Sequence, residues 1–393
     1  METPFFLIHR EKLTENIRNF RDGMQRNWPN SRLAYSVKTN SLPWVLRNMK
    51  TSGLLAEVVS DEEYELALAC GFSDADIVFN GPIKTEKWFR HALHNGAWVN
   101  LDSERELEWL KTDHLAHTKI GLRINIPTKL FSEKDVGFQN DSFRFGFDVE
   151  SGEFERALSI VKKSVSDPEL GLHLHCNSIT RSREVYRTIA AYAAEMIDRF
   201  DLRLSFLDIG GGFFGGVPGK TTPHEYFSII AKELSTSKKT EDVLLIAEPG
   251  SAIIGSTAEL HTTVLDVKDV GDARIVTTDG SRIFIDPLWS KHSYSYRTQS
   301  KCSEGSDRRQ IICGYTCMDH DRLMTIDNGP TLQVGDRIIY QRVGAYSMTF
   351  SGPFIRTYPE VYVLCEDGIC KIRDRFSVDT YYKLHTTFAE GEP

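Results

Sequence analysis

Eight short apolar runs alternate with segments of helical period, and this alternation restricts the possible folds more than any other feature of the sequence. The runs are RLAYSVK (32–38), LLAEVVS (54–60), DIVFN (76–80), AWVNLD (97–102), KIGLRINI (119–126), ELGLHLHC (169–176), LSFLDIG (204–210) and DVLLIAE (242–248). Continuous apolar strands separated by helix candidates, such as 61–71, 103–112 and 183–200, are typical of a parallel sheet covered on both faces. The pattern predicts an α/β fold with a TIM-type (β/α)8 barrel over residues 25–264, and an open doubly wound sheet is the alternative.

The pattern changes to strands and turns near residue 265. The strand-like stretches are STAELHTTVLDVKDV (256–270), DARIVTTDGSRIFI (272–285), DRIIYQRVGAYSMTF (336–350) and EVYVLCEDGIC (360–370). The opening PFFLIHR (4–10) is also strand-like, and we expect it to pair with this later sheet. The sequence therefore predicts a C-terminal all-β domain made of residues 1–24 plus 265–393. Residues 127–143 have no clear period and are long for a connection, so they form a candidate functional loop.

Charge and cysteine content narrow the choice of partners. The chain has 47 basic and 55 acidic residues, a formal charge of −8, and no block rich in lysine and arginine. Nucleic acid and membrane partners are therefore not expected, whereas a small molecule is. No apolar run approaches the roughly 20 residues that span a bilayer. The seven cysteines have no repeating spacing, which favours reduced thiols and a cytoplasmic location. The pair Cys313 and Cys317 lacks further ligands, so we expect no metal.

The chemistry of a parallel barrel gathers where its strands end. The side chains expected there are mostly polar: Lys38, Glu57, Arg123, His175, Asp208 and Glu248. A lysine in a water-poor site can bond to a carbonyl carbon, and the glycines 210–212 let backbone amides approach an anion. Glu248 can keep a ring nitrogen protonated. These three features together predict a site for pyridoxal 5′-phosphate (PLP).

Each of these features has a commoner explanation when it is taken alone. A single lysine at a strand end is usually a solvated rim residue, a run of glycines is usually a loop, and His175 alone would be a hydrogen-bonded core histidine. Glu57 and Arg123 are expected to form an ion pair that holds the rim. The prediction of a cofactor site therefore depends on the placement of all these residues at consecutive strand ends.

Six ordered motifs resemble a known family. AYSVKTN, HLHCNS, DIGGGF, AEPG, CGYTCMDHD and GAY occur in the order found in the alanine-racemase-fold (fold type III) PLP-dependent decarboxylases, which include the ornithine, arginine and diaminopimelate decarboxylases. The resemblance extends from PFFLIHREKL to GAYSMTF, nearly the whole chain. It implies a carboxy-lyase that removes the α-carboxyl group of an amino acid, with PLP as cofactor.

The resemblance also implies roles for particular residues. Lys38 would bond covalently to the cofactor, His175 would stack on its ring, and Glu248 would pair with its pyridine nitrogen. The phosphate would be held by Ser178, Gly212 and Tyr346, and the remaining cofactor-binding candidates are Gly210, Gly211, Gly250 and Ser251. Cys317 would return a proton to the α-carbon from the second subunit of a homodimer. Arg144 begins the RFG segment that resembles the end of the loop beside the substrate.

The substrate is less clear, because this chain departs from the family at three expected substrate contacts. Ser251 replaces the arginine of EPGR, Met318 replaces the acid that follows the cysteine, and DPLWS (286–290) stands where diaminopimelate decarboxylases have RPALY. Asp286 or Asp319 remains able to bind an amine. These departures favour a modified, acylated or carrier-tethered amino acid from a siderophore or antibiotic type of pathway. Free ornithine, lysine or diaminopimelate is the first alternative, and a non-catalytic binding homologue is the second.

Overall fold

The computed structural model describes residues 1–112, 115–137, 142–291, 293–300, 305–350 and 352–386. These residues form two compact units, one of residues 15–253 and one of residues 1–14 with 254–393. We call them the barrel unit and the β unit. The boundaries expected from the sequence were 24/25 and 264/265. Among the described residues, no helix is long and apolar enough to cross a membrane.

The barrel unit contains a closed barrel of eight parallel strands, which confirms the predicted fold class. Its strands are β2 (Ser31–Ser36), β3 (Leu55–Val58), β4 (Ile77–Phe79), β5 (Trp98–Leu101), β7 (Lys119–Asn125), β10 (Glu169–His173), β11 (Phe206–Asp208) and β12 (Leu244–Ala247). They pair in this order, β10 pairs with β7, and β12 pairs with β2, so the barrel closes. Each of the eight apolar runs in the sequence supplies one strand.

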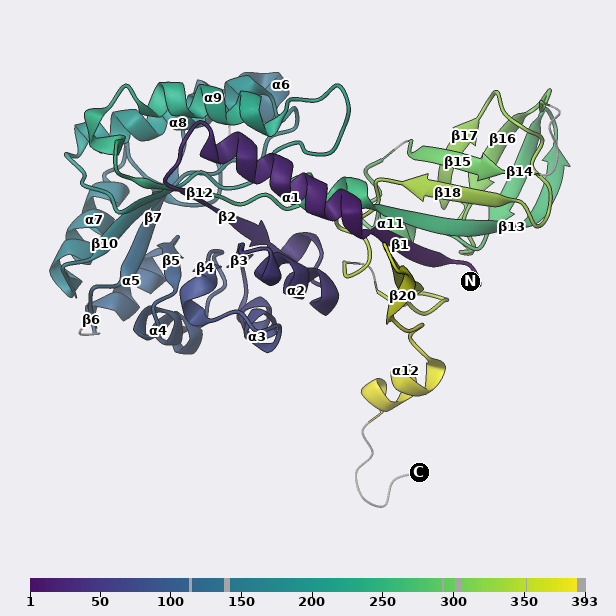
Figure 1. Ribbon diagram of the computed structural model, residues 1–393, viewed down its shortest axis with the longest axis horizontal. Coiled ribbons are helices and arrows are strands. Elements are labelled where there is room, and N and C mark those ends of the chain that lie inside the picture. The colour runs from purple at the N-terminus through teal and green to yellow at the C-terminus, as the bar shows by residue number, and fades with distance from the viewer. Residues whose placement is uncertain (113–114, 138–141, 292, 301–304, 351, 387–393) are drawn as a thin grey trace, which may run out of the picture. The chain divides into compact units, whose positions relative to one another are not determined.

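Helices flank the barrel on both sides in Figure 1. The helices with residues in this unit are α1 (Arg10–Gln25), α2 (Pro43–Thr51), α3 (Asp61–Ala69), α4 (Glu86–His94), α5 (Glu104–Lys111), α6 (Glu133–Val136), α7 (Glu153–Ser164), α8 (Arg183–Arg199), α9 (Pro223–Leu234) and α10 (Ser251–Ile254). Their start signals are local. Ser103 and Glu106 form a capping box at α5, and Thr222 and Glu225 form another at α9. The helices predicted over 61–71, 103–112 and 183–200 are α3, α5 and α8.

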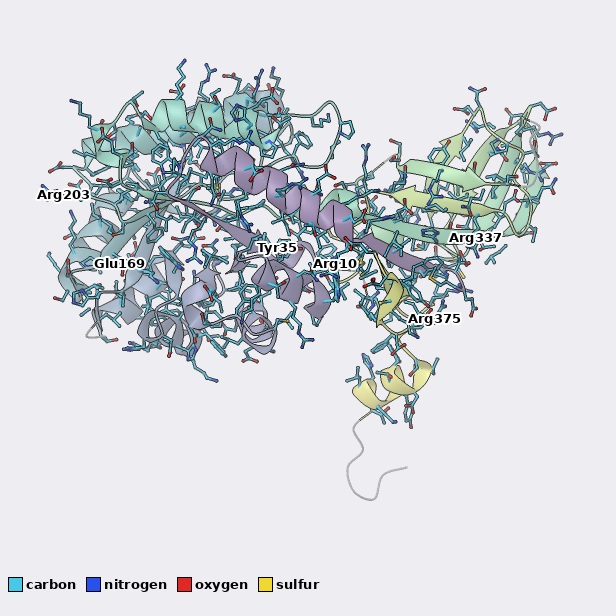
Figure 2. All side chains as sticks on the ribbon, viewed as in Figure 1. Arg10, Tyr35, Glu169, Arg203, Arg337 and Arg375 are labelled. Atoms are coloured by element: carbon cyan, nitrogen blue, oxygen red, sulfur yellow. The ribbon has the colours of Figure 1, made fainter. Side chains whose placement is uncertain are left out.

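Side chains fill the interior of the barrel near the start of its strands. The cluster is Ala34, Leu55, Val78, Trp98, Phe206 and Ile246, one residue from each of six strands. Phe206 needs glycine on the neighbouring strand, because a Cβ on Gly171 would lie 2.2 Å from its ring. In Figure 2, Glu169 and Arg203 mark the edge where strands begin, and Tyr35 lies near the end of β2. This packed layer leaves the carboxyl ends of the strands for polar side chains.

The β unit is a nine-stranded mixed sheet. Its strands are β1 (Phe5–His9), β13 (Ala258–Val270), β14 (Ala273–Thr278), β15 (Ser295–Gln299), β16 (Arg309–Cys313), β17 (Arg322–Ile326), β18 (Arg337–Gln341), β19 (Glu360–Cys365) and β20 (Gly368–Arg373). β1 lies between β13 and β19, as predicted for the opening residues. The unit also has helices α11 (Arg282–Ile285) and α12 (Val378–His385). α11 occupies the apolar end of a stretch expected to form strands and turns, and the hydroxyl of Ser281 caps it.

Candidate active site

Lys38 lies in a short 3-10 turn, Val37–Thr39, directly after β2. Its Nζ donates to both carboxylate oxygens of Glu57, at 3.0 and 2.8 Å. Glu57 lies opposite Ser36 on the adjacent strand β3, and only 1% of its side chain is exposed, against 42% for Lys38. The buried carboxylate therefore holds the amine at the carboxyl end of the barrel, while solvent still reaches the nitrogen.

A chain of amide hydrogen bonds connects the carboxylates at the strand ends. Asn80 Nδ2 donates to Glu57 Oε1 at 3.2 Å and to Glu248 Oε1 at 2.5 Å. Asn100 Nδ2 donates to Asn80 Oδ1 at 2.8 Å and to Asp208 Oδ2 at 3.1 Å. All five residues are buried. The network fixes the Glu248 carboxylate, which the sequence analysis expected to face a ring nitrogen. We call the group Lys38, Glu57, Asn80, Asn100, His173, His175, Asp208 and Glu248 the barrel mouth.

Two buried acids of the barrel mouth, Asp208 and Glu248, have raised pKa values. Burial raises the pKa of Asp208 to about 6, against hydrogen bonds that lower it. Burial and the neighbouring charges of Asp208 and Glu57 raise the pKa of Glu248 well above its usual range. Side-chain atoms of His173, Asp208 and Glu248 lie within 4.8 Å of one another, and burial lowers the pKa of His173 well below its usual range. The raised pKa values of the two acids and the lowered pKa of His173 all favour uncharged side chains in this cluster.

His175 follows β10 and packs closely against the glycine loop that follows β11. Gly210 has φ +66°, and a Cβ there would lie 2.5 Å from His175 Nδ1. Gly212 has φ +89°, so both positions suit glycine. Burial, together with the charges of Arg123 and Lys38, lowers the pKa of His175 to about 3. The imidazole is therefore neutral, as a group that stacks on an aromatic ring can be.

Arg123 does not pair with Glu57, so that part of the sequence analysis was wrong. Arg123 Nη1 instead donates to Asp102 Oδ2 at 3.0 Å. The reason is the strand order: Asp102 directly follows β5, which is the neighbour of β7, whereas Glu57 lies on β3. Asp102 Oδ1 also accepts from the backbone amide of Gly146 at 2.6 Å. The pair thus anchors the RFG segment.

Sequence reasoning missed Asn80, Asn100 and His173. The strand-end argument named residues on six of the eight strands and omitted the third and fourth, although Asn80 directly follows β4 and Asn100 lies on β5. The same argument would have found both. His173 carries no such signal, because a buried histidine at the end of an apolar run is usually structural.

A buried ion pair supports the ends of β4 and β5. Lys84 Nζ donates to Glu106 Oε1 at 2.7 Å and to the carbonyl oxygens of Gly81 and Asn100 at 2.7 and 3.0 Å. Lys84 and Glu106 are each about 1% exposed. Asn100 belongs to the amide chain above, so this pair holds the backbone that carries the barrel-mouth amides.

The candidate residues of the β unit lie in two turns. Cys317, Met318 and Asp319 lie between β16 and β17, in a turn organised by Asp321. The Asp321 carboxylate, 2% exposed, accepts from Ser281 Oγ at 2.9 Å, from Thr316 Oγ1 at 2.7 Å and from the amide of Arg282 at 3.0 Å. Cys317 and Asp319 are exposed and Met318 is half-buried. Tyr346, in the second turn, has φ +52° and is 38% exposed.

The candidate functional loop at 127–143 contains a 3-10 turn (Thr128–Leu130) and α6 in its described part. Residues 138–141 lie outside the described residues. Arg144, just beyond, is exposed, and its guanidinium lies 4.4 Å from the ring centroid of Phe145. Asn125 Nδ2 donates to the carbonyls of Phe143 and Phe145 at 2.5 and 2.9 Å, and so fixes the end of the loop.

The barrel mouth fits PLP. The ring nitrogens His173 Nδ1, His173 Nε2 and His175 Nδ1 are buried and have no hydrogen-bond partner among the described residues, so they can accept a ligand. A Cβ on Gly211 would lie 2.4 Å from the carbonyl oxygen of Glu248, so this loop lies as close to β12 as only glycine allows. The barrel mouth combines a lysine, buried carboxyl groups and a glycine loop. These features together are those of a barrel enzyme of the PLP-dependent class.

Comparison with known families gives the same result. The family model described as the pyridoxal binding domain of the pyridoxal-dependent decarboxylases matches residues 11–255. The chain belongs to this family. It is a PLP-dependent carboxy-lyase.

The similar proteins include several diaminopimelate decarboxylases. A probable chloroplastic diaminopimelate decarboxylase of Oryza sativa subsp. japonica is 28% identical over 97% of this chain and 79% of its own length. The diaminopimelate decarboxylase of Helicobacter pylori J99 is 26% identical over 99% and 97%. The crystal structure of the H. pylori enzyme complexed with L-lysine has a TM-score of 0.83 at 25% identity, covering 98% of this chain and 97% of that one. The diaminopimelate decarboxylase from M. jannaschii shares the fold, with a TM-score of 0.86 at 22% identity, covering 98% and 93%.

Proposed function

We propose that this chain removes the α-carboxyl group from a free amino acid with a second polar group at its far end. Diaminopimelate, lysine and ornithine are the first candidates. The observation that carries the proposal is Glu248, a buried carboxyl group that Asn80 fixes at the end of β12 and whose pKa is raised by burial and by the charges of Asp208 and Glu57. PLP, when bound, supplies a conjugated ring that stabilises the negative charge left on the α-carbon.

The proposal gives a defined role to each residue of the candidate site. Glu248 would pair as a carboxylate with the protonated ring nitrogen, and the positive charge of that nitrogen would offset the cost of ionising a buried acid. Lys38, positioned by Glu57, bonds to the cofactor, and neutral His175 covers one face of the ring. Ser178, Gly212 and Tyr346 bind the phosphate. Cys317, from the partner subunit of a homodimer, returns a proton to the α-carbon.

The substrate assignment changes in favour of the free amino acids. The sequence analysis preferred a modified or tethered substrate because three family contacts are absent. The similar proteins carry the names of diaminopimelate decarboxylases, which favours the alternative, and they give no support to a siderophore or carrier-tethered substrate. The structure also places the guanidinium of Arg181 on Ser251, where the family has its arginine, so a cation is still present there.

Asp319 is a better candidate than Asp286 for binding a distal amine. The Asp286 carboxylate accepts from Arg282 Nη2 at 2.6 Å and from the amides of Ser290 and Lys291 at 3.1 and 2.9 Å. These bonds already satisfy it. Asp319 is exposed.

A modified amino acid remains the second candidate, and Met318 is the observation that favours it. An apolar thioether in place of an acid suits a distal group that carries no charge, such as an acylated amine. Under this alternative, N-acylated diamino acids would be decarboxylated faster than the free ones.

A competition assay separates the two candidates. The purified holoenzyme is incubated with an equimolar mixture of diaminopimelate, lysine, ornithine and their distal N-acetyl forms, and the decarboxylated products are followed by mass spectrometry. We expect products of the free amino acids to dominate. Products from the acetylated forms alone would reject the proposal in favour of the modified substrate.

Met318 provides a second test with a matched control. Met318→Glu adds a carboxylate where the family has one, whereas Met318→Leu keeps the volume and adds no charge. We expect Met318→Glu, and not Met318→Leu, to increase the rate for a free diamino acid relative to its acetylated form by about tenfold, as one charged hydrogen bond would. Equal ratios in both variants would show that Met318 does not face the distal group.

A further inference from the structure

Arg181 reaches across the barrel unit to the residue that stands in place of the family's arginine. Its Nη1 donates to Ser251 Oγ at 3.0 Å, although 70 residues separate the two. Ser251 follows Gly250 after β12, at the position of the arginine in the EPGR motif of the resembling decarboxylases. The chain therefore keeps a guanidinium next to this position but supplies it from another loop.

The backbone at Arg181 is held in an unusual conformation. Arg181 has φ +50°, in the left-handed region that non-glycine residues rarely occupy. Its amide donates to Ser178 Oγ at 2.9 Å, and its carbonyl accepts from Tyr226 OH at 2.6 Å. Both ends of the residue are thus fixed, and the side chain leaves the backbone in a defined direction.

The flanking residues brace the same loop. The hydroxyl groups of Thr180 and Ser182, on either side of Arg181, both donate to the Asp135 carboxylate, the second at 3.2 Å. The amide of Ile179 donates to the Asp135 carbonyl at 2.7 Å. Asp135 is 4% exposed and lies in the candidate functional loop. A rigid loop loses little conformational entropy when it binds a ligand.

The charge of Arg181 is not neutralised by a neighbour. Its guanidinium carbon lies 5.4 Å from the ring centroid of Phe214, and Lys220 Nζ lies 5.2 Å from the same ring. Within the described part of the barrel unit, no carboxylate lies within 4.0 Å of the Arg181 guanidinium. A half-buried cation without a carboxylate partner is well suited to an anionic ligand.

We propose that Arg181 is the cation that binds the 5′-phosphate of the cofactor in this chain. The inference rests on the proposed cofactor site, because Ser178 and Ser251, two of the polar partners of Arg181, are candidate cofactor residues. Arg181 thus places a positive charge next to Ser251 from the loop after β10. The glycine loop and Ser178 offer neutral donors to the same anion, and Arg181 adds the charged one.

Cofactor binding tests the proposal without measuring activity. PLP and pyridoxal, which lacks the phosphate, are titrated into cofactor-free wild type, Arg181→Ala and Arg183→Ala. Arg183 is the matched control, because it is an exposed arginine two residues away whose carboxylate neighbour is Glu225 at 3.6 Å. We expect Arg181→Ala to weaken PLP binding by about ten- to a hundredfold and pyridoxal binding by less than about twofold. Arg183→Ala should change neither affinity.

A rescue variant covers the case in which Arg181→Ala disturbs the loop. Arg181→Ala combined with Ser251→Arg returns the charge to the family's position. The double variant should bind PLP at least about tenfold more tightly than Arg181→Ala alone. Equal losses for PLP and pyridoxal without rescue would overturn the proposal and leave Arg181 a structural residue. Unchanged PLP affinity with weaker binding of a carboxylate-bearing substrate would overturn it in favour of a substrate contact. If wild type bound no PLP at Lys38, the proposed cofactor site itself would fail.

Discussion

The buried acids Asp208 and Glu248 of the barrel mouth and the buried Glu259 of the β unit behave in opposite ways. In the barrel mouth, burial raises the pKa of Asp208 to about 6 and that of Glu248 well above its usual range, because their neighbours are amides and other acids. In the β unit, hydrogen bonds from His261, His9 and Arg297 outweigh burial and lower the pKa of Glu259. Glu259 therefore has cationic partners that favour its ionised form, whereas Asp208 and Glu248 lie among groups that disfavour ionisation.

This difference separates a structural role from a functional one. A buried acid with cationic partners stabilises the fold when it is ionised, whereas an acid held by amides and other acids costs free energy when it is ionised. Buried acids that are costly to ionise are found mainly at sites where they bind or activate a ligand. The barrel mouth therefore suits a ligand that brings a positive charge to these carboxyl groups, as the proposed protonated ring nitrogen would.

The largest expected effect is the loss of activity when one proposed catalytic residue is removed from either unit. Lys38→Ala and Cys317→Ala remove one residue from each unit, and each should reduce activity by at least about a thousandfold. If Cys317 acts in the partner's site, mixing the two variants under subunit exchange gives heterodimers with one intact site. Random exchange makes about half of the dimers mixed, so activity should recover to about a quarter of wild type.

The controls for this experiment are simple. Native mass spectrometry must show mixed dimers, and Cys370→Ala, which removes another exposed thiol, should leave activity unchanged. A mixture that stays as inactive as its parents despite proven exchange would place both residues of one site in the same chain.

Replacing one buried acid of each unit by glutamine tests the difference between the two units directly. Glu248→Gln should reduce decarboxylation by about a hundred- to a thousandfold while leaving the free energy of unfolding at pH 8 unchanged or higher, because glutamine cannot ionise at this buried position. Glu259→Gln should lower the free energy of unfolding by about 3 kcal/mol, because it leaves Arg297 without its partner. Urea unfolding and steady-state assays on both proteins test this. Similar stability losses in both variants would remove the distinction between the units.

The smallest expected effect is a change with pH in the stability of Asp208→Asn relative to wild type. An acid whose pKa is raised by folding stabilises the protein at low pH, and that contribution is lost as pH rises through the folded-state pKa, about 6 for Asp208. At pH 5 Asp208 is mostly protonated and resembles asparagine. The stability of cofactor-free Asp208→Asn relative to wild type should therefore rise by about 1.4 kcal/mol between pH 5 and pH 8. A difference that is flat with pH would contradict the raised pKa.

The sequence predicted the fold well because its signals are local. Strand-length apolar runs and helix caps give the barrel, and the strand-end rule placed Lys38, His175 and Glu248 together. The pairing of Glu57 was missed, because its partner depends on strand order and side-chain reach. Arg181 was missed because its position depends on a left-handed backbone angle and on a contact with Ser251 across 70 residues.

Covalent trapping tests the central claim, that the barrel mouth holds the cofactor on Lys38, most directly. Cofactor-free protein is incubated with PLP, reduced with borohydride, digested and analysed by peptide mass spectrometry. The account predicts one stoichiometric label on the peptide that contains Lys38, and a much weaker label in Glu57→Gln, which lacks the charge that positions the amine. A label on another lysine, or none on wild type, would contradict the account.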